Sequence, residues 1–324
     1  MTSRTTGGTS DKAERAALSN AGKALRAGDA APARALLAGT RSQPDRREHQ
    51  VGELGKAGAE QLESLGGLLE EHPGDPDLLL LLGAALAAAA GKARGSAVAS
   101  ALSGNQVRDM FSLGQEARQH LHAATEAAPE DPVPWSVLMR LAQFAPGHDG
   151  EWREAFAEVT KRAPLLYRAN VTALACLTRK WHGSEAEQVA FARERAAAVP
   201  DGHPVLALVP LSHIESYVDG LMRGNAVVRI GRVLTQRRLK KRRAKAEVNA
   251  ASERLLNSPL PHPSAPDAHQ TFAVYYHRVR DTERLRAHLE RSGTKVAEFP
   301  AGYFGDHVKL FAEARAAAGL APKS

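Results

Sequence analysis

Apolar residues recur at helical spacing through most of the chain. Stretches such as "LESLGGLLEEHP" and "ARQHLHAATEAAP" place Leu and Ala three or four residues apart, which is the period of a helix with one buried face. Each stretch ends at a proline, which cannot continue a helix. Segments of this kind end at residues 44, 73, 129, 164 and 200. The pattern predicts a series of amphipathic helices punctuated by proline.

The proline spacing indicates a repeat. The intervals are 29, 56, 35 and 36 residues, and two of them lie near the period of about 34 that is typical of tetratricopeptide (TPR) repeats. Leu79, Trp135 and Asn170 each follow a proline by six residues. Helical pairs of this kind cannot bury their apolar faces alone, so they stack into a solenoid. The 56-residue interval implies about 22 additional residues, within residues 92–114.

Composition supports the same class of fold. Aromatic residues reach only 5%, while Ala and Leu dominate an apolar content of 43%, and this balance favours helices over strands. We predict an all-α protein: an irregular TPR-like helical-hairpin solenoid with an inserted basic helix and a C-terminal capping hairpin. The predicted parts are a disordered tail (1–10), the TPR-like array (11–222), the basic helix (223–258), a proline-rich linker (259–266), and the C-terminal hairpin and cap (267–324).

Two short motifs carry a resemblance to a known family. "WHGSEAE" at Trp181–Glu187 has the form Trp-x-Gly-Ser-x2-Glu, and "PAGYFGD" at Pro300–Asp306 has the form Pro-x-x-Tyr-x-Gly-Asp. With "DPVPWSVLMRLA", they resemble an uncharacterised family of TPR-like proteins from high-GC actinobacteria. The resemblance covers roughly residues 20–222 and 265–318 and leaves out the basic segment. It implies a fold but no activity.

The positive charge is concentrated in one segment. Ten Lys and Arg residues and no acid lie between Arg223 and Lys245, so subtracting them from the net charge of +7 leaves −3 for the rest. The alternatives are a solvated or internally paired helix, nonspecific contact with a polyanion or acidic protein, and a membrane surface. The segment lacks aromatics for base stacking and bulky apolar anchors for a bilayer. We expect one helix over about 225–256 that leaves the body beyond Arg238. The candidate polyanion contacts are Arg237, Arg238, Lys240, Lys241, Arg242 and Arg243.

Three features bear on location. The longest apolar run, Leu78–Gly91, has 14 residues, fewer than the roughly 20 that a membrane span needs, so we expect a buried helix. The first twelve residues lack the apolar core of a secretory signal. The only cysteine, Cys176, rules out an internal disulfide and is expected to be buried. We therefore expect a cytoplasmic protein without a membrane span.

No catalytic motif is present. The chain has no phosphate-binding loop, no Gly-x-Ser-x-Gly turn and no His-Glu-x2-His pair. His120 and His122 are two residues apart, which places them on different sides of a helix. His269 and His277, beside two tyrosines, are expected as partly buried polar tips. We predict no enzyme activity, no cofactor and no metal site.

The expected function follows from the fold. A helical solenoid offers a long inner surface for a protein or peptide partner. On TPR geometry that surface draws on the first helix of each pair, where the candidates are Arg140, Gln143 and Arg168. Trp135, Trp152 and Trp181 are expected in the core, with a ligand groove as the alternative. The leading hypothesis is a non-catalytic scaffold. The alternative is an accessory protein that contacts nucleic-acid phosphates nonspecifically through residues 229–245.

Overall fold

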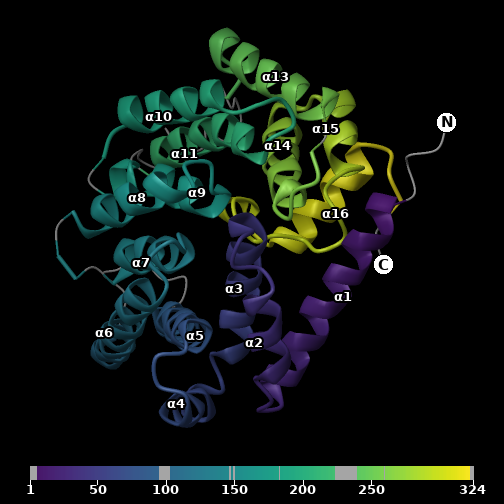
Figure 1. Ribbon diagram of the computed structural model, residues 1–324. Helices are drawn as coiled ribbons and strands as arrows, with labels where there is room; N and C mark the ends of the chain where they lie inside the picture. The colour runs from purple at the N-terminus through teal and green to yellow at the C-terminus, as the bar shows by residue number, and fades with distance from the viewer. Residues whose placement is uncertain are drawn as a thin grey trace. The chain divides into compact units, whose positions relative to one another are not determined.

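All regular structure in the described part of the chain is helical (Figure 1). The computed structural model describes residues 6–94, 103–145, 147–148, 150–181, 183–222, 239–258 and 260–321. The predicted all-α class is confirmed. The first helix already begins at Thr6, so the tail expected over residues 1–10 is helical in its described second half.

The helices form two compact units, Met1–Thr172 and Ala173–Ser324, and the boundary between them falls within α9. Unit 1 contains α1 (Thr6–Arg26), α2 (Ala31–Ala38), α3 (Pro44–Gly58), α4 (Leu62–Glu71), α5 (Pro76–Arg94), α6 (Gly104–Ala127), α7 (Val133–Phe144), α8 (Glu151–Arg162) and the start of α9 (Tyr167–Cys176). Unit 2 contains η2 (Arg179–Trp181), α10 (Glu185–Ala198), η3 (Pro204–Ala207), α11 (Leu208–Met222), α13 (Arg242–Asn257), α14 (Ala265–Val279), α15 (Thr282–Leu289), η4 (Ala301–Phe304) and α16 (His307–Ala317).

Proline marks the helix ends much as the sequence predicts. The prolines at 73, 129, 164 and 200 each follow the end of a helix by two residues. Pro44 is different, because it is the first residue of α3. An N–H group at this position has no acceptor within the helix, so proline costs no hydrogen bond there. The long interval between Pro73 and Pro129 contains long helices: α5 has 19 residues and α6 has 24, whereas α7 and α8 have 12 each.

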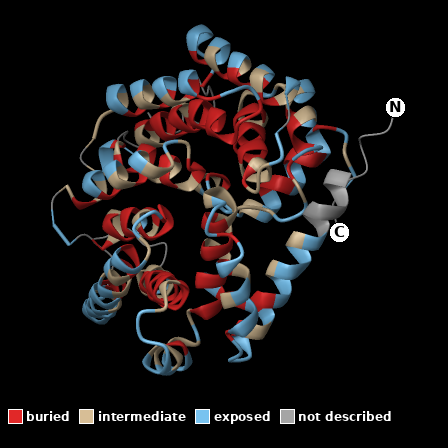
Figure 2. Ribbon diagram, in the orientation of Figure 1, coloured by how far each residue is buried: buried red, intermediate tan, exposed pale blue. Residues whose placement is uncertain are grey.

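Helix α5 is the core of unit 1. Its residues Leu78 to Ala87 are all buried, and it packs against α3, α4, α6 and α7 (Figure 2). By length and composition α5 is also the one described helix apolar enough to cross a membrane, and 61% of its most apolar window is buried inside the structure. A helix that is apolar on all sides fits the interior of a helical protein.

Two glycines let α5 approach its neighbours closely. A Cβ on Gly83 would lie 2.7 Å from Cγ of Leu121 in α6. A Cβ on Gly55 in α3 would lie 2.9 Å from the carbonyl oxygen of Ala84. Interiors are packed to crystal density, so neither site has room for one more carbon without movement of a helix.

A methyl group at Gly55 is expected to separate α3 from α5. Because the clash is with backbone, Gly55→Ala should lower the free energy of unfolding by roughly 1–3 kcal/mol. Gly67→Ala in α4 is the matched control, since nothing lies within 4 Å of its Cβ. That change should stabilise the protein by about 0.5–1 kcal/mol through helix propensity. Urea denaturation measures both, and a Gly55→Ala variant as stable as the wild type would contradict the close packing.

The core of unit 2 is built around α14. Phe272, Tyr275 and Tyr276 are fully buried on it, and it packs against α11, α15, α16 and η3. The predicted C-terminal hairpin corresponds to α14 and α15, and the predicted terminal helix corresponds to α16. Residues 260–264 of the proline-rich stretch are not helical, while Pro266 is the second residue of α14.

The predicted basic helix is not continuous. Leu239 and Lys240 form a turn, and α13 begins only at Arg242. Residues 223–238, with Arg237 and Arg238, lie outside the described part of the chain. The prediction that the helix leaves the body is also wrong for the described part, because α13 packs against η3 and α11 through Val248, Ala251 and Leu255. These apolar residues are three and four positions apart, so they form one face of the helix. Burial of this face holds α13 against its neighbours despite the charge of its first turn.

Candidate functional site

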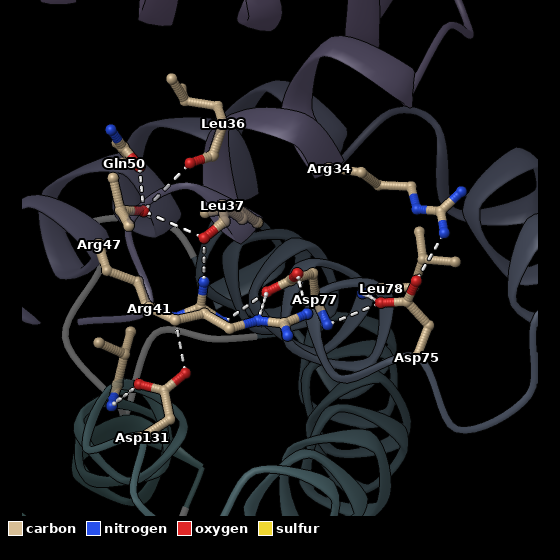
Figure 3. A network of polar contacts seen from close by, with 12 residues as sticks. Arg34, Leu36, Leu37, Arg41, Arg47, Gln50, Asp75, Asp77, Leu78 and Asp131 are labelled. Carbon is tan, nitrogen blue, oxygen red and sulfur yellow. Dashed lines mark hydrogen bonds and ion pairs between the residues drawn. The ribbon is translucent and has the colours of Figure 1, made fainter. Parts of the chain in front are cut away.

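A buried arginine joins four elements of unit 1. Arg47 on α3 is 0% exposed, and its guanidinium donates three hydrogen bonds (Figure 3). Nε contacts Asp131 Oδ2 at 2.6 Å, Nη2 contacts Asp77 Oδ1 at 2.7 Å, and Nη1 contacts the carbonyl oxygen of Leu37 at 2.6 Å. Each of the three guanidinium nitrogens of Arg47 thus has an acceptor. These contacts hold the starts of α5 and α7 against α2 and α3.

The aspartates around Arg47 also cap helices. Asp131 accepts a hydrogen bond from the backbone N–H of Val133 at 2.9 Å, at the start of α7. Asp75 accepts from the N–H groups of Asp77 and Leu78, at the start of α5, and pairs with Arg34 at 2.6 Å. Carboxylates are stabilised at helix N-termini by the unpaired N–H groups there. This cluster is therefore explained by the packing of unit 1.

Glu48, the next residue of α3, is also buried. Its carboxylate accepts hydrogen bonds from the backbone N–H groups of Arg168 at 2.9 Å and Ala169 at 3.1 Å, and from the hydroxyl of Ser136. Burial raises the pKa of Glu48 to about 7, and the hydrogen bonds from Ser136 and Arg168 together with the charge of Arg168 oppose the rise. The carboxylate fixes the first turn of α9 against α3 and α7, which sets the position of the Arg168 side chain.

Two of the predicted partner-binding residues, Arg140 and Arg168, lie near each other in unit 1. The Arg168 guanidinium lies over α3: Nη2 is 3.4 Å from His49 Nδ1 and 3.9 Å from a Glu53 oxygen, and a Cβ on Gly52 would lie 2.4 Å from its Nη1. Arg140 on α7 is exposed to solvent, although the protein surrounds it closely enough for desolvation to lower its pKa. The positive charge of Arg168 lowers the pKa of Arg140 further.

The third predicted residue is on the same helix as Arg140. Gln143 lies three residues further along α7 and is half-buried. Among the described residues, Arg140 has no ion pair with an acid, and Glu53 influences it only through space. We call the surface that carries His49, Glu53, Arg140, Gln143 and Arg168 the arginine surface. It can hold a carboxylate or another anion by charge-assisted hydrogen bonds.

Unit 2 contains a buried chain of polar side chains that the sequence did not indicate. Ser252 Oγ is 2.8 Å from His288 Nε2, and His288 Nδ1 is 2.8 Å from His269 Nδ1. The His288 ring stacks on Phe272 with centroids 4.6 Å apart. Burial lowers the pKa of His269 to about 4 and that of His288 well below 6.5. Both imidazoles are therefore neutral at pH 7.

The order serine–histidine–histidine is that of a nucleophile, a base and an orienting group. However, Ser252 and His288 are 0% exposed and His269 is 5% exposed. A small cavity beside α14 lies instead on the face that carries Gln270, Ala273 and His277. A substrate therefore has no access to Ser252 Oγ, and the chain of contacts satisfies buried polar groups. Both His269 and His277 were expected to be partly buried. His277 is half-buried as expected, whereas His269 is more buried than expected.

The tyrosine of the second family-like motif lies in a polar cluster of unit 2. Tyr303 Oη, from the Pro-x-x-Tyr motif, donates to Glu215 Oε1 at 2.6 Å. Lys180, next to Trp181, contacts Tyr303 Oη at 2.6 Å and Glu215 Oε2 at 3.3 Å. Burial and the charge of Glu215 raise the pKa of the Tyr303 hydroxyl well above its usual range. Each member of this trio is hydrogen-bonded to the other two, which gives the tyrosine of the second motif a structural role.

Of the six predicted polyanion contacts, four lie in the described chain. Lys240, Lys241, Arg242 and Arg243 are all exposed at the start of α13. Arg243 pairs with Glu247 at 3.0 Å, and the other three make no ion pair with a described acid. Arg237 and Arg238 are outside the described residues. Internal pairing, one of the predicted alternatives, therefore applies to only part of the segment.

Other sequence expectations have simpler outcomes. Cys176 is buried, as predicted. In the first family-like motif, Ser184 caps α10 by accepting from the N–H of Glu187 at 3.2 Å. The three tryptophans are half-buried rather than fully within the core. No group of three metal-ligating side chains occurs among the residues that the structure describes.

No protein-family model, curated protein or solved structure matches the chain. The resemblance to TPR-like proteins therefore remains a prediction.

Proposed function

We propose that the protein is a non-catalytic cytoplasmic scaffold of the TPR-like helical-repeat class. In this proposal, the arginine surface of unit 1 binds an acidic peptide segment of a protein partner. The observation that carries it is the pair Arg140 and Arg168. Two guanidiniums from different helices lie near each other, and the charge of one lowers the pKa of the other.

The repulsion between the two arginines favours an anionic ligand. Within the described chain, the ion pair of the Arg168 guanidinium is with Glu53, at 3.9 Å, which is too long for a hydrogen bond. A carboxylate placed between the guanidiniums would supply the missing acceptor, and each hydrogen bond to a charged group is worth about 1.5–3 kcal/mol. The three contacts of Glu48 and the bonds of Arg47 hold α3, α7 and the start of α9 in place before binding, which reduces the entropy lost on binding.

Charge reversal tests this proposal. The double variant Arg140→Glu, Arg168→Glu and the wild type are used for affinity purification from extract of the source cells, with quantitative mass spectrometry. Acidic segments of the recovered proteins are then made as labelled peptides for fluorescence anisotropy. We expect the double variant to bind the peptide at least about a hundredfold more weakly, since each arginine contributes tenfold or more.

A matched control separates this surface from general charge effects. Arg108→Glu, Arg153→Glu changes two exposed arginines on α6 and α8 of the same unit and should leave affinity within about twofold, as rim charges do. Arg140→Glu alone covers the case in which loss of Arg168 disturbs α3. Equal binding by the wild type and both Arg140 variants would overturn the proposal.

A further inference from the structure

The start of α13 carries cations on an anchored turn. We call Lys240, Lys241, Arg242, Arg243 and Lys245 the basic turn. Leu239, just before it, is 0% exposed, and its carbonyl oxygen accepts a hydrogen bond from the hydroxyl of Tyr275 at 2.7 Å. The cations are therefore presented from a fixed position on unit 2.

Most of this charge is not neutralised by acids in the described part of the chain. Lys240, Lys241 and Arg242 are exposed and have no ion pair with any acid in the described chain. Arg243 pairs with Glu247 but keeps a side chain 78% exposed, and Lys245 approaches Asp281 only to 3.7 Å with a side chain 48% exposed. Glu247 itself is shared with Arg193 at 2.8 Å and with His213 at 3.2 Å. Nearby acids thus cannot cancel the basic turn.

The turn after α14 carries a further cation, one residue before the acid that Lys245 approaches. Arg280 follows α14 with φ of 62°, in the left-handed region where glycine is usual, and its side chain is exposed. A non-glycine residue there costs about 1 kcal/mol. The next residue, Asp281, is the one that Lys245 approaches. A positive charge is favourable at the end of a helix, and here it also extends the basic surface.

We propose that the basic turn, together with Arg280, binds the phosphate backbone of double-stranded nucleic acid without reading its sequence. Exposed lysines and arginines contact phosphates as charges, and they gain affinity by releasing the counterions of the duplex. Direct readout would need side chains placed against base edges, and the basic turn consists of cations and one buried alanine. The proposal is independent of the partner-binding surface in unit 1.

The burial pattern disfavours two other polyanions. Membrane attachment needs apolar side chains beside the charge, but Leu239 is 0% and Ala244 is 5% exposed, so both point into the protein. Single strands are held by stacking on exposed aromatics. The aromatics beside the basic turn, Tyr275 and Tyr276, are each 0% exposed. A duplex, whose phosphates are fully exposed and closely spaced, is the polyanion that fits cations alone.

Fluorescence anisotropy with the full-length protein tests the proposal. The probes are a labelled 24-base-pair DNA duplex of random sequence, a labelled 24-nucleotide thymidine strand, and vesicles containing phosphatidylserine. With all six cations engaged, the slope of log affinity against log salt should be near −5, and affinity should fall roughly 10³-fold between 50 and 200 mM salt. Lys240→Gln, Lys241→Gln, Arg242→Gln should weaken duplex binding and reduce the slope by about 3.

The control triple variant removes the same charge elsewhere. Arg15→Gln, Lys23→Gln, Lys309→Gln alters three exposed cations on α1 and α16. It should keep the wild-type salt slope within about 1. The proposal is overturned if the wild type does not bind the duplex at 50 mM salt, if the control loses as much affinity as the test variant, or if vesicles or the single strand bind more tightly than the duplex.

Discussion

Arg47→Ala is expected to lower the free energy of unfolding by roughly 3–5 kcal/mol, which is a large part of the stability of a typical domain. Asp77 and Asp131 are 3% and 6% exposed, and both contact the Arg47 guanidinium. Without the guanidinium, both carboxylates would stay buried without the positive charge that compensates them. Asp77 would keep only Arg41, whose side chain is 50% exposed, and Asp131 would lose its ion pair. The carbonyl of Leu37 would also lose its donor.

Two further variants separate this cause from simple loss of a side chain. Arg47→Ala, Asp77→Asn, Asp131→Asn removes the buried charge, and asparagine can still cap α7 at Val133. We expect the triple variant to be more stable than Arg47→Ala alone, because the uncompensated charges are gone. Arg34→Ala breaks the half-exposed pair with Asp75 and should cost less than about 1 kcal/mol.

Chemical denaturation followed by circular dichroism measures all three variants. The ordering is the decisive result: Arg34→Ala near the wild type, Arg47→Ala least stable, and the triple variant between them. If Arg47→Ala costs no more than Arg34→Ala, the buried cluster does not hold the helices together. The same comparison matters for function, because Arg47 fixes α3 and α7, the two helices that carry His49 and Arg140.

The helices of the fold were predictable because their signals are local. Proline after α4, α6, α8 and α10, and serine before α10, act through the backbone of their own segment. The prediction of a continuous basic helix was wrong because the contacts that interrupt the helix are not local in the sequence. Nothing between Gln236 and Ala244 is a proline or glycine, and the residues favour a helix. The turn at Leu239 depends on burial of that side chain and on the hydroxyl of Tyr275, which lies 36 residues away.

For the two candidate binding surfaces, the sequence predicted only the residues that carry exposed charge. Arg140, Arg168 and Lys240–Arg243 could be picked from geometry or from charge, and each has some exposed surface. Arg47 and Glu48 lie in "DRREHQ", which reads as a solvated charged face. Their burial depends on Asp131, Ser136 and the start of α9, all more than 80 residues away. No local pattern indicates partners at such separations.

The structure also makes unit 2 sensitive to acid. His269 has a pKa of about 4 in the folded protein, whereas the usual value is 6.5. Between these values the unfolded chain binds the proton and the folded chain does not, so the free energy of unfolding falls as pH falls from 6.5 to 4. A difference of 2.5 units corresponds to about 3 kcal/mol. His288 shifts in the same direction and adds to the loss.

The charged groups near the pair do not favour its protonation. Arg291 lowers the pKa of both imidazoles, each imidazole faces the other, and the remaining contacts are neutral: the Ser252 hydroxyl and the rings of Phe272 and Tyr276. A proton on either ring would therefore sit in a buried place without a carboxylate. Unit 2 is expected to unfold at a higher pH than a histidine-free core would.

Removing the pair should remove the pH dependence. In His269→Leu, His288→Phe, Ser252→Ala, all members of the polar chain become apolar, so no buried group is left unpaired. The wild type should lose at least about 3 kcal/mol between pH 6.5 and 4 beyond the loss in the variant. Hydrogen exchange of the α14 amides, corrected for the intrinsic pH dependence, reports on unit 2 directly. His72→Gln, at an exposed site of unit 1, should keep the wild-type profile. If the triple variant shows the same acid loss as the wild type, the buried histidines are not its cause.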